Sequence, residues 1–157
     1  MKRLAAFLLV LLISGCVASY QAPQVHQVEK ERVYSKTPDQ VWDKVVEWFA
    51  LHASPVKNMD RSSGFIASEY NLSIEDYPQY SDCGSTTASM MQAIAITSPT
   101  GNFNILIRKT ADDKVRVVVT AAFHAKTVAT GQYGGGTDIE CTSRGVLEKQ
   151  LLDFIDK

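Results

Sequence analysis

The strongest pattern in the chain is an alternation of apolar and polar residues over residues 114–126. Every second position is apolar, at Val115, Val117, Val119, Ala121 and Phe123. The positions between them are largely polar, among them Arg116, Thr120, His124 and Lys126. Successive side chains of a strand point to opposite faces of a sheet. The segment is therefore predicted to be a strand with one buried face and one face toward water.

Shorter apolar runs bounded by turn residues predict further strands. They lie at 29–35, 56–59, 65–73, 89–97 and 103–110. The turn residues of 60–64 join two of these runs in a hairpin. Ser98-Pro99-Thr100-Gly101 and Asp112-Asp113 separate the later strands at hairpin distances. We therefore expect consecutive strands to pair antiparallel.

An amphipathic helix is predicted between the first two of these strands. Thr37 can cap it, Pro38 suits the first helical position, and Gln40 completes a capping box. It should end near 52–54, because Pro55 disfavours helical geometry in the residue before it. Its apolar stripe consists of Val41, Trp42, Val45, Val46, Trp48 and Phe49.

A second amphipathic helix is predicted at the C-terminus, over 143–156, with Thr142 or Ser143 as its cap. Its apolar positions are Leu147, Leu151, Phe154 and Ile155. The whole pattern predicts an α+β fold, with an antiparallel sheet of about five to six strands. Both helices are expected on one face of that sheet, in a single domain over 29–157.

The N-terminus has a different pattern, with Lys2 and Arg3 followed by ten apolar residues over 4–13. Such a run is too short to span a bilayer comfortably and has the proportions of the apolar core of a signal peptide. The tetrapeptide Ile13-Ser14-Gly15-Cys16 follows. It resembles the lipobox of bacterial lipoprotein signal peptides. An ordinary secreted protein cleaved nearby is the alternative.

The lipobox resemblance implies cleavage between Gly15 and Cys16 and acylation of Cys16. A diacylglyceryl thioether on sulfur and a third acyl chain on the new amino group would anchor the chain, since two or more chains give stable membrane binding. Residues 1–15 are then a signal peptide and 16–28 a tether. Val17 replaces the Asp common in lipoproteins retained in the inner membrane. We expect a periplasm-facing protein, anchored in the outer membrane rather than the inner one.

The charge of the chain bears on one class of partner, nucleic acids. Removal of residues 1–15 leaves 14 basic and 17 acidic residues, a formal charge of −3. A nucleic-acid-binding protein carries a clustered basic face, and this chain has no basic block. We therefore expect no nucleic-acid partner.

Two cysteines, Cys83 and Cys141, remain once Cys16 is acylated. Two thiols in an oxidising periplasm form a natural pair, so we expect a disulfide. A reactive thiol at Cys83 is the alternative, although the chain lacks Cys-x-x-Cys and no neighbouring base is apparent from the sequence.

The order of strand, helix, antiparallel strands and closing helix resembles the helix-grip arrangement. The passage from Val41-Trp42 through Arg61-Ser62-Ser63-Gly64-Phe65-Ile66 is similar to the small helix-grip modules of envelope lipoproteins. These include a lipoprotein subunit of the outer-membrane β-barrel assembly machinery. The chain departs from that group in its cysteine pair, its Gly-rich segment and its single module.

The residues that could carry chemistry form no recognised catalytic or metal-binding motif. His26, His52 and His124 lack the spacing of metal ligands, so we expect no metal or other cofactor. The Gly-rich segment 131–136 lacks the Gly-Lys-Ser/Thr ending of a phosphate loop and is predicted to be a mobile loop. There is no Gly-x-Ser-x-Gly motif for a serine hydrolase.

Carboxylates and tyrosines leave two further alternatives. Glu69, Glu75, Asp76 and Asp82 supply the acids of a glycosidase-like pair, but such pairs are defined by geometry. Tyrosines are enriched at interfaces, so Tyr70, Tyr77, Tyr80 and Tyr133 could form a recognition surface. The alternative is that Tyr70 packs in the sheet and the others lie in loops.

These patterns favour a non-enzymatic envelope lipoprotein that acts as an interaction or accessory module, with an envelope protein as its partner. A carrier of a small apolar ligand or lipid, held between sheet and helix, is the alternative. A cell-wall hydrolase is the weaker third interpretation.

The lipid anchor is tested directly by Cys16→Ala. Without the thiol no thioether can form, so metabolic labelling with a fatty acid should be lost and the domain should leave the membrane fraction. Acyl labelling that persists in this variant would contradict the assignment.

Overall fold

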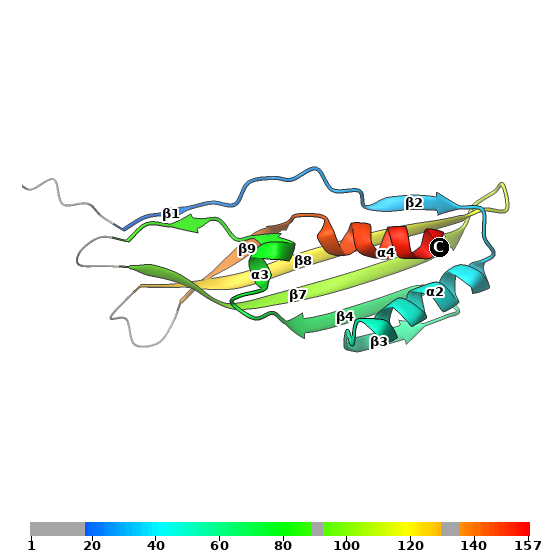
Figure 1. Ribbon diagram of the computed structural model, residues 1–157, viewed down its shortest axis with the longest axis horizontal. Coiled ribbons are helices and arrows are strands. Elements are labelled where there is room, and N and C mark those ends of the chain that lie inside the picture. The colour runs from blue at the N-terminus through cyan, green and yellow to red at the C-terminus, as the bar shows by residue number, and fades with distance from the viewer. Residues whose placement is uncertain (1–17, 89–92, 130–135) are drawn as a thin grey trace, which may run out of the picture.

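The computed structural model describes residues 18–88, 93–129 and 136–157 and has the predicted α+β architecture (Figure 1). A seven-stranded antiparallel sheet forms the body, and a small two-stranded sheet pairs β1 with β6. The helices are α2 (Pro38–Leu51), α3 (Tyr77–Tyr80) and α4 (Val146–Asp156). The strands are β1 (Tyr20–Gln21), β2 (Glu31–Tyr34), β3 (Val56–Asp60), β4 (Phe65–Asn71), β5 (Ser81–Asp82), β6 (Ser85–Thr86), β7 (Ile94–Lys109), β8 (Val115–Ala129) and β9 (Thr137–Ser143). The main sheet is larger than the five to six strands expected.

The long strands β7 and β8 form the spine of the sheet and run most of the length of the molecule (Figure 1). The order across the sheet is β3-β4-β7-β8-β9-β5. The second edge of β8 is shared, because β2 pairs with its first residues and β9 with its later part. Strand β2 is also attached to α4, since the Tyr34 hydroxyl donates to Leu152 O and Arg32 forms ion pairs with Asp153 and Asp156.

The main core lies between one face of the sheet and the two longer helices. Helix α2 begins as predicted: the Thr37 side chain accepts from the Gln40 N–H, and the Gln40 side chain accepts from the Thr37 N–H. The predicted alternation in β8 is confirmed, because Val115, Val117 and Val119 are fully buried. Aromatic residues of this core are Tyr34, Trp42, Trp48, Phe49 and Phe103, and its aliphatic residues include Ile105, Leu151, Leu152 and Ile155.

A second, smaller core lies further along the same sheet. It consists of Cys83, Phe123, Ala125 and Cys141. Ala121 and Leu147 pack against both cores. The interior is therefore divided into two clusters that meet near the start of α4.

The hairpin turn predicted at Ser98–Gly101 is wrong, because β7 continues without interruption from Ile94 to Lys109. The pairing with β8 shifts register between Thr97 and Thr100, and Ser98 has a φ of 50°. Proline has no N–H to donate, so a bulge accommodates Pro99 within the strand. The same residues that favour a turn here form a β-bulge.

The predicted cap of the last helix is also wrong. Helix α4 begins at Val146 with Gly145 as its N-cap, and Thr142 and Ser143 belong to β9. Gly145 has a φ of 78°, a conformation that glycine adopts without steric cost. The Ser143 hydroxyl accepts from the Gly145 N–H and donates to the Glu148 carboxylate. These two hydrogen bonds connect the end of β9 to the first turn of α4.

Gly64, at the turn between β3 and β4, cannot accept a side chain. Its φ is 59°, and a Cβ placed there would lie 2.3 Å from the Ile107 carbonyl oxygen. We expect Gly64→Ala to lower the free energy of unfolding by about 2–4 kcal/mol, from left-handed strain and overpacking together. Chemical denaturation measures this, with exposed Ala111→Ser as the control. A loss no larger than that of the control would contradict the geometry.

Candidate functional site

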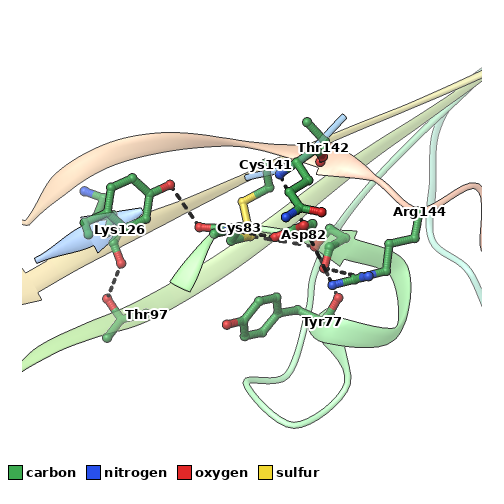
Figure 2. Close-up of a disulfide and its surroundings, with 12 residues drawn as sticks. Tyr77, Asp82, Cys83, Thr97, Lys126, Cys141, Thr142 and Arg144 are labelled. Carbon is green, nitrogen blue, oxygen red and sulfur yellow. Dashed lines mark hydrogen bonds and ion pairs between the residues drawn. A yellow bond between two sulfur atoms is a disulfide. The ribbon is translucent and has the colours of Figure 1, made fainter. Parts of the chain in front are cut away.

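A disulfide between Cys83 and Cys141 joins the segment between β5 and β6 to β9, as predicted (Figure 2). Both cysteines are almost completely buried. Tyr77 and Tyr80, from the short helix α3, pack against this cluster. Because both thiols are used in the bond, Cys83 is not the reactive thiol that was the alternative.

Asp82, beside the disulfide, binds groups from three parts of the chain. Its carboxylate accepts from the Gly84 N–H at 2.8 Å and the Gln24 N–H at 3.3 Å, and it lies 3.2 Å from His26 Nε2. Arg144 is 4.0 Å away. Burial acts to raise the pKa of Asp82, but these hydrogen bonds and the Arg144 charge outweigh burial and hold the pKa below its ordinary value.

The segment before β2 is bound along the domain by hydrogen bonds from several residues. Strand β1 pairs with β6, and the Tyr20 hydroxyl donates to Cys83 O at 2.9 Å. The Thr142 hydroxyl donates to Gln24 O at 2.5 Å. Residues 19–26, within the segment 16–28 predicted to be a tether, therefore contact the rest of the domain through long-range hydrogen bonds.

The predicted cleavage and acylation residues, Gly15 and Cys16, lie outside the described residues. In the part of the chain that is described, no helix is long and apolar enough to cross a membrane.

A groove of about 340 Å³ opens where the two cores meet, between the end of α2, the end of β4, α3 and the start of α4. Its walls include Trp48, Phe103, Tyr70, Tyr80 and Leu147. Polar groups at the rim come from His52, Ser73, Asp76 and Gln150. A concave, partly aromatic surface with a few polar groups is the usual form of a small-molecule site.

Two buried polar atoms near this groove have no hydrogen-bond partner among the described residues, Tyr70 Oη and Glu148 Oε2. Glu148 is completely buried, and its other oxygen accepts from Ser143 Oγ at 2.7 Å. No single motif of the sequence singles out Glu148. Its signal was its spacing, because it lies three and seven residues before Leu151 and Ile155, on the apolar face of the helix.

The three histidines are placed in different surroundings. His52 Nδ1 lies 2.8 Å from Trp48 O, and the ring stacks on Trp48 with centroids 4.4 Å apart. His26 contacts Asp82, and His124 is exposed on β8. Within the described ranges, no group of three or more His, Cys, Asp or Glu residues could hold a metal ion.

The candidate carboxylates are engaged separately. Glu69 on β4 forms an ion pair with Lys57, Asp76 accepts from Ser73, and Asp82 is bound as described above. None of the hydrogen bonds or ion pairs of the described residues joins two of these carboxylates. Tyr70 packs against the main core from strand β4, as the alternative interpretation held. The same interpretation placed Tyr77 and Tyr80 in loops, which is wrong, because they form the short helix α3. Tyr133 lies outside the described residues.

A scan against models of protein families and a search of curated proteins gave no match to this chain. Its function must be argued from its own residues.

The disulfide closes a loop with a sequence separation of 58. The entropy of such a loop predicts that the double variant Cys83→Ala/Cys141→Ala loses about 4 kcal/mol of unfolding free energy. Denaturant titration of both proteins measures the difference. A loss below about 1 kcal/mol would show that the bridge does not restrict the unfolded chain as this model requires.

Asp82 should contribute an acid-sensitive part of the stability. Because its pKa is lower in the folded protein, its contribution is present above its ordinary pKa of about 3.9 and disappears as pH falls through the folded value. We expect Asp82→Asn to flatten the dependence of unfolding free energy on pH between about 5 and 2. The control is Asp138→Asn, the same substitution at an exposed residue of β9. Equal curves for both variants would contradict the role of Asp82.

Proposed function

We propose that the protein is a lipid-anchored, periplasm-facing envelope protein that acts as a non-enzymatic interaction module held in a fixed orientation. The anchor is the acylated Cys16, and the outer membrane is the expected location. Its partner would be another envelope protein, to which it would bind as an accessory module.

The binding of residues 19–26 to the disulfide end is the observation that supports this proposal. Cys16 precedes Ser19 by three residues, so their Cα atoms are at most about 11 Å apart whatever the conformation between them. Ser19 is itself bound, because its N–H donates to Thr87 Oγ1 and its carbonyl accepts from the Thr87 N–H. Acyl chains on Cys16 would therefore hold the β1–β6 end against the bilayer.

The opposite end of the sheet would then project away from the membrane. The turn between β7 and β8 lies at the far end of the molecule from β1, together with the start of α2 (Figure 1). A short anchor attached to a bound segment suits a stationary partner-binding role better than a shuttling one.

The packing of the core favours this role over that of a lipid carrier. Trp48, Phe103 and Leu151 fill the space between sheet and helices, and each is at most 2 % exposed. A carrier of an acyl chain needs an enclosed apolar cavity large enough to hold that chain. A cell-wall hydrolase is the less favoured alternative, because Glu69 pairs with Lys57 and Asp82 with His26 rather than with each other.

Site-specific photo-crosslinking in cells tests the orientation and the partner together. A photoreactive residue replacing exposed Ala22, which directly follows β1, should form adducts with lipid. The same residue at exposed Asp112, in the turn between β7 and β8, should form a discrete protein adduct and no lipid adduct. The matched control carries Cys16→Ala and should lose both adducts. Lipid adducts at Asp112, or no protein adduct there under any growth condition, would contradict the proposal.

A further inference from the structure

We propose that the groove between α2, β4, α3 and α4 is a binding site for a primary alkylammonium group. This site does not depend on acylation of Cys16, so it and the proposed function can fail separately. Three features of the groove support the assignment: unpartnered acceptors beside its wall, the sign of its charge, and its aromatic lining.

The acceptors are Tyr70 Oη and Glu148 Oε2, both buried and without a partner among the described residues. Burial raises the pKa of Tyr70, and nearby Tyr80 and Glu148 raise it further, which places the three groups within electrostatic range. An ionised carboxylate only accepts hydrogen bonds, and burying it without a cation is costly. An ammonium group has three donors and a positive charge, which complement these two acceptors.

Gly101 makes room for this arrangement. It lies opposite Tyr70 in the β4–β7 pairing, and a Cβ there would come within 3.2 Å of Tyr70 Cζ. The ring of Tyr70 therefore lies over the glycine. Leu147 and Gln150, which flank Glu148 on α4, line the groove.

The charge of the groove also favours a cation. Asp76 contributes a carboxylate to the rim, and among the described residues neither lysine nor arginine lines the groove. His52 also lines the groove, and its Nδ1 lies 2.8 Å from Trp48 O. A bound anion would find no fixed positive charge among the residues that line the groove.

The remaining walls suit the alkyl chain that bears the ammonium group. Tyr70, Tyr80 and Leu147 are partly exposed, and Trp48 and Phe103 lie behind them. Aromatic faces attract cations as well as apolar groups, so the same walls stabilise both parts of such a ligand. A volume of about 340 Å³ admits a short amine.

The test is calorimetric titration of the full chain, in a non-ionic detergent, with n-pentylamine. We expect saturable binding of one ligand per chain, whereas 1-pentanol, which has nearly the same shape and no charge, should not bind. Capped lysine and phosphoethanolamine form two further arms. Binding of the first identifies a protein side chain as the source of the ammonium group, and binding of the second identifies a lipid headgroup.

Variants locate the site. We expect Glu148→Gln, which keeps the shape of the side chain, to weaken pentylamine binding at least about 10-fold, because a hydrogen bond to a charged group is lost. Tyr70→Phe should weaken binding about 3-fold or more. The matched control is exposed Glu75→Gln, expected to bind as the parent does, and circular dichroism checks that each variant is folded. Equal binding of pentylamine and 1-pentanol, no binding of pentylamine, or unchanged binding in both folded groove variants would overturn the proposal.

Discussion

The fold depends on a mismatch of length between its long strands and its helices. A strand of 15 residues, such as β8, spans about 50 Å, whereas helices of 14 and 11 residues span about 21 and 17 Å. The helices therefore bury one part of the sheet and leave the part beyond Ala121 to other structures. Beyond Ala121, the disulfide, α3 and the N-terminal segment cover the sheet in place of the helices, around Phe123 and Ala125 (Figures 1 and 2). Covalent and polar contacts replace helix packing where the helices end.

The junction between these two parts is where the unusual chemistry lies. Helix α2 ends there and α4 begins there, so neither helix covers the sheet completely. Glu148 is buried at this junction with one oxygen satisfied by Ser143, and the Tyr70 ring lies over Gly101. An apolar residue at position 148 would fit the surrounding core better, since a buried carboxylate without a cation is destabilising. The proposed cation in the adjacent groove would neutralise that carboxylate, which explains its burial better than packing does.

Local signals predicted the local structure well. The capping box at Thr37 and Gln40, and the alternation in β8, depend on neighbours in sequence, and both were found as expected. The bulge at Ser98 and Pro99 was misread, because proline and small polar residues favour turns and bulges alike. The binding of Gln24 and His26 could not be predicted, since their partner Asp82 is 58 and 56 residues away. Of the candidate site, the cysteine pair was predicted, but the groove depends on tertiary contacts. The resemblance to helix-grip modules stays a prediction.

Hydrogen exchange along β8 tests most directly whether the sheet is held in two different ways. The account predicts that Cys83→Ala/Cys141→Ala speeds the exchange of amides at 123–127 and in β1 more than the exchange of those at 115–119, because the amides under the helices exchange only through global unfolding. Uniform acceleration along the whole strand, or none at 123–127, would contradict it.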